Sequence, residues 1–218
     1  MEVKIQEISL QHALPEVFAN RDWVESDVWH QEVAFRHGEM YLLTAASGTG
    51  KSSLCSYLYG MRNDYQGLIL FDGKNIRSLN AAQWIALRTR SISMLFQDLR
   101  LFPELTTLEN IRLKNQLTGY QKKSFIKESL ERLGIGDKLN TPVGKLSFGQ
   151  QQRVALVRAL CQPFDFICLD EPISHLDEAN AEGMAQLLRE EADRQGAGII
   201  VTSVGKHLPL DYTKIWKL

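Results

Sequence analysis

The sequence predicts an α/β fold with a parallel or mixed sheet at its core. Two short runs, 164–169 and 198–202, are almost continuously apolar, as expected of strands that are buried on both faces. Amphipathic segments of helical length, such as 179–194, separate the apolar runs. Strands that alternate with helices in this way form parallel sheets, whose ligands bind at the carboxyl ends of the strands.

Taken in order, the first part of the chain supplies most of the expected strands. Strands are expected at 3–10, 33–35 and 40–43, followed by a helix from about residue 51 to Gly60. Residues 67–74 predict a strand that turns at Asp72-Gly73, and therefore a hairpin arm. A helix at 81–88 and a short apolar strand at 91–96 complete this part.

The second part predicts a helical insert and then a return to the sheet. Residues 98–146 hold turn residues between amphipathic segments such as 125–133, without a repeat or a long heptad pattern. A helix is expected at 147–160, and the two buried strands follow with a helix between them. Residues 212–218 are expected to close the sheet as an edge element.

Composition excludes several classes of protein. Lys and Arg number 25 against 26 Asp and Glu, so the basic excess of a dedicated nucleic-acid binder is missing. Cys55, Cys161 and Cys168 lie in apolar segments without metal-ligand spacing, which indicates buried, reduced thiols of a cytosolic protein. No apolar run approaches the ~20 residues of a membrane span, and the first residues predict no signal peptide. Any role at a membrane therefore requires a partner.

The segment 42–53, with the sequence L-L-T-A-A-S-G-T-G-K-S-S, is the first candidate site. A strand that leads into a glycine-bearing loop and then a helix presents backbone N–H groups and a helix dipole to a phosphate. We expect Lys51 to reach the β- and γ-phosphates of a nucleotide and the Ser52 hydroxyl to ligate Mg²⁺. The expected phosphate-binding residues are Ala45, Ala46, Ser47, Gly48, Thr49, Gly50, Lys51, Ser52 and Ser53.

One position departs from the pattern G-x-x-x-x-G-K-[ST], because Ala45 replaces its first glycine. A methyl group is tolerated there only where the backbone keeps φ negative. Gly48, Gly50, Lys51 and Ser52 are in register. We therefore expect a working phosphate loop with negative φ at Ala45, rather than a chance match in a surface loop.

Two carboxylates directly follow the buried strand at 164–169. Asp170 is expected to hold the Mg²⁺ shell, and Glu171, which points in another direction, to polarise an attacking water as general base. Charged residues also end many strands without any function. The pairing with Lys51 and Ser52 is what favours a site.

Ser147 and Gln150 have the spacing of a capping box, which predicts a helix N-terminus able to contact an anion. Taken alone, this pattern indicates only a well-capped amphipathic helix. Three aromatic residues, Phe18, Trp23 and Trp29, are candidates for stacking on an adenine ring. Ordinary core or edge packing is the favoured alternative for each of them.

Together these motifs resemble the ATP-binding cassette (ABC) ATPase family over nearly the whole chain. They follow the order of that family: the phosphate loop at 45–52, Gln97 in the place of the Q-loop, the signature segment at 146–150, Asp170 and Glu171 as Walker B and catalytic glutamate, and the D-loop at 174–177. The stretches 96–98, 101–106 and 108–111 are similar to the transporter-type Q-loop region.

The resemblance implies a P-loop NTPase fold of ABC type, with a mixed or parallel sheet core, an antiparallel β subdomain and a helical subdomain. It implies a single domain over 1–218. In that domain the segments of about 1–80 and 161–218 form the nucleotide-binding core with the β subdomain, and about 81–160 forms the helical subdomain with the signature helix.

A mechanism also follows from the resemblance. In the family two cassettes close head to tail, so that Ser147, Gly149 and Gln150 would contact the γ-phosphate of ATP held by a partner cassette, identical or related. Ser52, Gln97 and Asp170 are the implied Mg²⁺ ligands, and Glu171, Gln97 and Ser203 the implied catalytic residues. Near Gln97 a membrane permease would dock on the helical subdomain. The chain would then be cytoplasmic, peripheral on the inner face of the cytoplasmic membrane, and bind no nucleic acid.

The main departure from the family pattern is Ser203, which replaces the switch histidine. A serine can bond a phosphate oxygen but is shorter and brings no cationic imidazole, so we expect normal ATP binding and slow turnover. His207 would substitute only if the backbone curls back, and a solvated loop histidine is favoured. Phe148 replaces a small signature residue and is expected to be tolerated, and His175 in the D-loop is expected at an interface.

Three functions remain in competition. The leading one is the ATPase subunit of a membrane ABC system, most similar to the small cassettes paired with lipoprotein-releasing, macrolide-export or cell-division permeases. The alternative is a slow or degenerate nucleotide-gated switch that regulates a membrane partner. The departures at Ala45 and Ser203 favour this alternative more than intact family motifs would. Soluble cassettes that act on DNA or ribosomes need a long coiled coil or two cassettes, and residues 98–146 are too short for the former.

Overall fold

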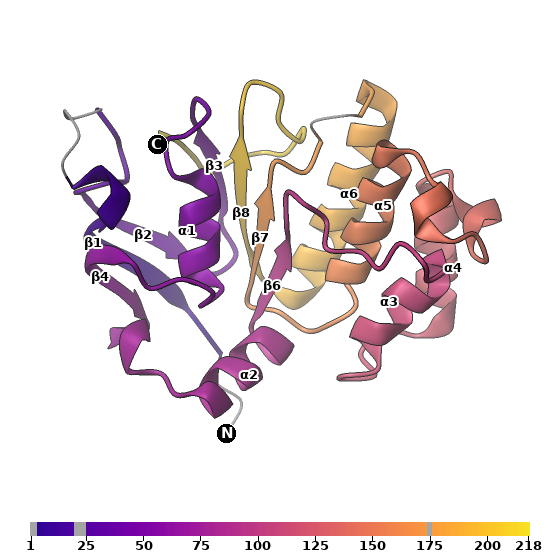
Figure 1. Ribbon diagram of the computed structural model, residues 1–218, viewed down its shortest axis with the longest axis horizontal. Helices are drawn as coiled ribbons and strands as arrows, with labels where there is room; N and C mark the ends of the chain where they lie inside the picture. The colour runs from indigo at the N-terminus through magenta and orange to yellow at the C-terminus, as the bar shows by residue number, and fades with distance from the viewer. Residues whose placement is uncertain (1–3, 20–24, 174–175) are drawn as a thin grey trace.

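The computed structural model describes residues 4–19, 25–173 and 176–218, which form two sheets and the helices around them (Figure 1). The core sheet has five parallel strands in the order β6-β7-β8-β3-β9. Their bounds are β3 (Met40–Thr44), β6 (Ile92–Leu95), β7 (Phe166–Asp170), β8 (Gly198–Ser203) and β9 (Lys214–Lys217). The two continuously apolar strands are neighbours at its centre, as their composition predicts.

The second sheet is antiparallel, with the order β2-β1-β4-β5. Its strands are β1 (Glu7–Pro15), β2 (Glu32–Arg36), β4 (Tyr65–Phe71) and β5 (Lys74–Asn75). The expected hairpin is present, because Phe71 pairs with Lys74 and leaves a two-residue turn. In that turn Asp72 and Gly73 have φ of +48° and +76°, as the tightest hairpin turns require. Fold class and hairpin are therefore both confirmed.

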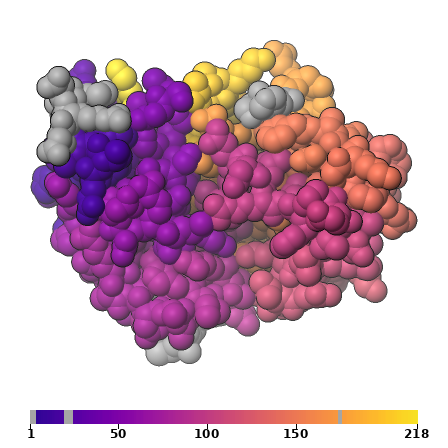
Figure 2. Space-filling model, viewed as in Figure 1, coloured from indigo at the N-terminus to yellow at the C-terminus, as the bar shows by residue number. Residues whose placement is uncertain are grey.

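Within the described residues, six α-helices surround the sheets. Their bounds are α1 (Lys51–Leu58), α2 (Ala81–Arg90), α3 (Thr107–Asn115), α4 (Lys123–Arg132), α5 (Phe148–Ala159) and α6 (Glu178–Gln195). Short 3₁₀ turns cover Glu16–Phe18, Ile76–Ser78, Gly136–Lys138 and Val143–Lys145. Figure 1 shows α1 beside the antiparallel sheet and α3, α4 and α5 on the other side of the core sheet. The same division runs across the surface in Figure 2, from indigo and magenta to pink and orange.

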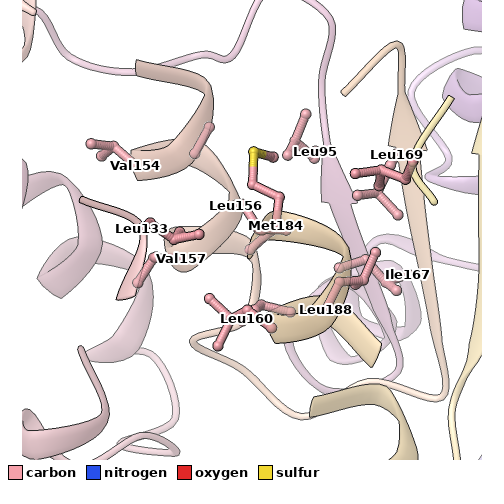
Figure 3. Close-up of a cluster of buried hydrophobic side chains, with 14 of the residues drawn as sticks. Leu95, Leu133, Val154, Leu156, Val157, Leu160, Ile167, Leu169, Met184 and Leu188 are labelled. Carbon is pink, nitrogen blue, oxygen red and sulfur yellow. The ribbon is translucent and has the colours of Figure 1, made fainter. Parts of the chain in front are cut away.

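Two hydrophobic clusters cover the two faces of the core sheet. Because successive side chains of a strand point to opposite faces, Ile167 and Leu169 of β7 join one cluster and Phe166 and Cys168 the other. Figure 3 shows Leu156 of α5, Leu160 just after that helix, and Met184 and Leu188 of α6 packed with the first pair. The second cluster holds α1 and the antiparallel sheet. The two faces therefore separate α1 from α5.

The cysteines are buried, as expected. Burial raises the pKa of the Cys168 thiol to about 12, so it carries its proton at neutral pH. Among the residues that the structure describes, no helix is long and apolar enough to cross a membrane. The predicted strand at 3–10 lies further along the chain, as β1, where a register shift between Gln11 and Leu14 accommodates a bulge.

Candidate functional site

The phosphate loop connects the carboxyl end of β3 to α1. Gly48 and Gly50 have φ of +81° and +97°, a region that a residue with a Cβ rarely enters. Ala45 is not among the described residues with positive φ, which confirms the condition set by its methyl group. Its N–H donates to the Ser203 carbonyl at 3.1 Å, so β8 holds the start of the loop.

Lys51 links this loop to the end of β7. Its side chain is only 5% exposed. The ammonium donates to the carbonyls of Ala46 at 2.8 Å and Ala45 at 3.4 Å, and lies 3.7 Å from Glu171 Oε1. Sequence analysis predicted that Lys51 and Glu171 share one site, and the structure brings them together. An anion in the loop would find this ammonium already directed into it.

The two carboxylates at the end of β7 have different surroundings. Asp170 is 3% exposed and its Oδ1 accepts a hydrogen bond from Thr202 Oγ1 at 2.7 Å. Glu171 has φ of +50°, unusual for a residue other than glycine, and its N–H donates to the Thr202 carbonyl at 3.1 Å. The backbone thus turns directly after Asp170. The sequence analysis did not identify Thr202, although this residue comes after the apolar residues of β8 as Asp170 comes after those of β7.

Ser52, Gln97 and Asp170 provide the oxygens that Mg²⁺ prefers, a hydroxyl, an amide carbonyl and a carboxylate. Ser52 Oγ and Gln97 Oε1 lie 3.4 Å apart, which shows that α1 and the segment after β6 meet here. The described part of the chain has no group of three or more His, Cys, Asp or Glu side chains that could hold a metal ion by themselves. The donor set fits a hard cation shared with phosphate oxygens.

The signature segment forms the predicted capping box. Ser147 N–H donates to Gln150 Oε1 at 3.0 Å, and Gln150 N–H donates back to Ser147 Oγ at 3.3 Å. Ser147 is exposed at the start of α5. Since α5 packs on the face of the core sheet opposite α1, this capped N-terminus and the phosphate loop are held apart within one chain.

The segment after Gln97 is held by an interaction that sequence analysis missed. Leu99 and Arg100 have φ of +56° and +47°. Arg158 of α5 donates to both of their carbonyls, at 2.6 Å to that of Arg100. Burial lowers the pKa of Arg158 to about 10. An arginine on an amphipathic helix gives no sequence signal for such a contact.

Ser203 lies at the end of β8 and is 2% exposed. Its hydroxyl donates to the Lys206 carbonyl, so a contact with phosphate would require that bond to break. His207 is exposed, and its Nδ1 donates to the Leu208 carbonyl at 3.1 Å. Its ring meets the ring of Tyr212 edge-on at 5.6 Å. These contacts agree with the favoured interpretation of His207 as a loop histidine.

The aromatic candidates for adenine stacking differ in position. Trp29 is 4% exposed and donates its indole N–H to the Thr49 carbonyl at 2.9 Å, which agrees with core packing. Phe18 is half-buried beside Gly50 and stays a candidate. Trp23 lies outside the described residues. So do Ser174 and His175 of the expected D-loop.

The parallel core sheet, with a phosphate loop at the carboxyl ends of its strands, defines a nucleotide-binding protein of the phosphate-loop class. Residues 30–174 match the family model described as ABC transporter. The lipoprotein-releasing system ATP-binding protein LolD of Myxococcus xanthus is 36% identical over 174 residues, which are 77% of this chain and 76% of that protein. The chain therefore belongs to the ABC transporter family, as one of its ATP-binding cassettes.

Comparison with solved structures gives the same fold. The dimeric structure of MJ0796, described as a bacterial ABC transporter cassette, has a TM-score of 0.76 and 25% identity, and the match covers 90% of this chain and 87% of that one. A post-hydrolysis dimer of MJ0796 bound to ADP and Pi has the same TM-score at 24% identity, over 91% of this chain and 88% of that one. The ABC fold predicted from the motifs is thereby confirmed.

Proposed function

We propose that this chain is the ATP-hydrolysing subunit of a membrane transport system, and that two cassettes close around ATP to drive a conformational change in a permease. The observation that carries the proposal is the approach of Lys51 to Glu171, 3.7 Å apart at the carboxyl edge of the parallel sheet. In this proposal Lys51 is the cation that binds phosphate, and the neighbouring Glu171 carboxylate acts as general base.

Each residue would have a separate task. Residues 45–53, and Lys51 above all, would bind the phosphates of ATP. Glu171 would accept a proton from the attacking water, and Gln97 would orient that water. Ser52, Gln97 and Asp170 would hold Mg²⁺, which when bound neutralises charge on the phosphate oxygens. Thr202 would keep the Asp170 carboxylate in place.

A second cassette completes the site in this proposal. Because α5 and α1 lie on opposite faces of the core sheet, Ser147, Gly149 and Gln150 would serve the ATP of a partner rather than their own. The γ-phosphate would then hold two subunits together, and its release would let them separate. The dimeric MJ0796 structure supports this arrangement.

The helical part near Gln97 is the proposed permease contact. Phe102, Leu113 and Leu117 of this part of the chain are 54%, 44% and 61% exposed and would offer apolar side chains to the permease. In this proposal the cassette is cytoplasmic and peripheral on the membrane, and about 81–160 forms the helical subdomain of a single domain over 1–218. LolD-type relatives, named for lipoprotein release, do not favour the nucleotide-gated switch.

A mixing experiment tests the proposal. Lys51→Ala removes the loop cation, and Ser147→Arg obstructs the signature contact. Each variant alone should lose ATP hydrolysis, whereas a mixture should regain part of it, since one of two head-to-tail sites pairs an intact loop with an intact signature. In parallel, Glu171→Gln should dimerise in excess Mg²⁺–ATP during size-exclusion chromatography. A Glu171→Gln protein that stays monomeric and retains no labelled ATP contradicts the proposal.

A further inference from the structure

The side chain of Trp29 supports the phosphate loop from the protein interior. Its Nε1–H donates to the Thr49 carbonyl at 2.9 Å, and the residue is 4% exposed. Thr49 immediately precedes Gly50, which is the N-cap of α1 and has φ of +97°. The bonded carbonyl therefore belongs to the last peptide group of the loop before the helix begins.

That hydrogen bond fixes the direction of one N–H group. In a trans peptide the carbonyl and the next N–H point in opposite directions. With the Thr49 carbonyl directed at the indole, the Gly50 N–H points away from it. The Gly50 N–H has no hydrogen-bond acceptor among the described residues. Because glycine has the freest backbone of all residues, this peptide needs an external contact to keep one orientation.

Trp29 is itself held firmly. Ser26 Oγ accepts the backbone N–H of Trp29 at 2.9 Å and that of Val28 at 3.1 Å. The backbone N–H of Lys217 donates to Asp27 Oδ2 at 2.7 Å, and the backbone N–H of Asp27 donates to the Lys217 carbonyl at 2.8 Å. Lys217 ends β9, which pairs with β3, the strand that leads into the loop. The indole and the loop are thus anchored on the same pair of strands.

The contact also leaves little room at Gly50. A Cβ built on Gly50 would lie 2.9 Å from the Phe18 ring and 3.1 Å from that of Trp29. The glycine is therefore required by its conformation and by its two aromatic neighbours together. No residue with a Cβ fits without displacing an aromatic ring.

We propose that Trp29 is a positioning residue for phosphate binding. It orients the Thr49–Gly50 peptide before ATP arrives, so that the Gly50 N–H is ready to donate to a phosphate oxygen. Without the indole N–H the peptide samples other orientations, and ATP binding must select the productive one. This inference rests on the proposed ATP site and adds a residue to it.

The test compares Trp29→Phe with Trp216→Phe. Trp216 belongs to the same hydrophobic cluster, where its ring stacks on Tyr41 at 5.4 Å, and is the matched control. We expect Trp29→Phe to bind labelled Mg²⁺–ATP about tenfold more weakly, a loss of about 1.4 kcal/mol. KM should rise by a similar factor while kcat stays within twofold. Trp216→Phe should keep the wild-type Kd.

A melting temperature that falls with an unchanged Kd and KM would overturn the proposal, since it would reduce Trp29 to a packing residue. If Trp29→Phe does not fold, β-(3-benzothienyl)alanine at position 29 keeps the shape of the indole and deletes only the N–H, with the same expectations. Wild-type protein that binds no ATP would refute the proposed function instead. Binding that is lost in Lys51→Ala but unchanged in both Trp29 variants refutes the positioning role alone.

Discussion

Replacing Thr202 by valine tests how the end of β8 supports the candidate site. Thr202 is fully buried, and its hydroxyl donates to the Asp170 carboxylate at 2.7 Å. Valine has nearly the same shape, so the substitution opens no cavity and removes only the hydroxyl. A hydrogen bond to a charged group contributes roughly 1.5–3 kcal/mol, and Asp170, itself 3% exposed, would lose this partner.

We therefore expect Thr202→Val to lower the free energy of unfolding by about 2 kcal/mol. For a domain of this size, that loss lowers the melting temperature by roughly 4–8 °C. Because the carboxylate also loses its fixed orientation, the Mg²⁺ concentration at half-maximal ATPase rate should rise several-fold. Calorimetry without nucleotide and a Mg²⁺ titration of the ATPase rate measure the two effects separately.

The matched control is Thr44→Val, at the end of the neighbouring strand β3. Its hydroxyl donates to the neutral Trp216 carbonyl over 3.3 Å and is only half-buried. We expect this variant to lose less than about 1 kcal/mol and to keep the wild-type Mg²⁺ dependence. The role assigned to the Thr202–Asp170 bond would be refuted if Thr202→Val and wild type had the same melting temperature and the same Mg²⁺ dependence of the ATPase rate.

Three further predictions concern other parts of the molecule. Arg158→Leu should release the carbonyls of Leu99 and Arg100 and lower kcat several-fold with little change in ATP affinity. An unchanged kcat would mean that the contact of Arg158 with these two carbonyls has no role in ATP hydrolysis. Ser203→His should raise the steady-state ATPase rate, and a rate equal to that of wild type would show that the serine has no catalytic cost. Burial and, second, Arg158 lower the pKa of Lys114 to about 8, so its charge destabilises the fold below pH 8, and this cost disappears as pH rises toward about 10.5. Lys114→Met should thus melt above wild type at pH 7, and a pH series of thermal melts should show this difference narrowing between pH 8 and pH 10.

The sequence predicted those features whose signals are local. The turn at Asp72-Gly73, the capping box of Ser147 and the loop before Lys51 each depend on a few adjacent residues. The joint position of Lys51 and Glu171 followed from a general property of parallel sheets, whose strands end at one edge. It needed no knowledge of which strands are neighbours.

Long-range contacts and irregular backbone could not be predicted from the sequence. Arg158 contacts the chain 58 residues earlier, and nothing in its own helix indicates that partner. The first strand was placed too early, since the alternation of apolar residues stops at Leu10. The bulge near His12, where φ is +52°, restores burial at Ala13 and Leu14 and lets the strand continue to Pro15. A period-two pattern cannot reveal a strand that changes register.

The backbone at the end of β8 determines what serine at position 203 changes in the proposed ATP site. The carbonyl of Ser203 accepts the Ala45 N–H, and the carbonyl of Thr202 accepts the Glu171 N–H. Both contacts use the backbone, which any residue at position 203 provides. Serine at position 203 therefore leaves the loop and the Glu171 carboxylate in position, and in the proposed site it lacks only what an imidazole would offer the γ-phosphate. For this reason we expect Ser203→His to change the ATP turnover rate without changing the affinity for nucleotide.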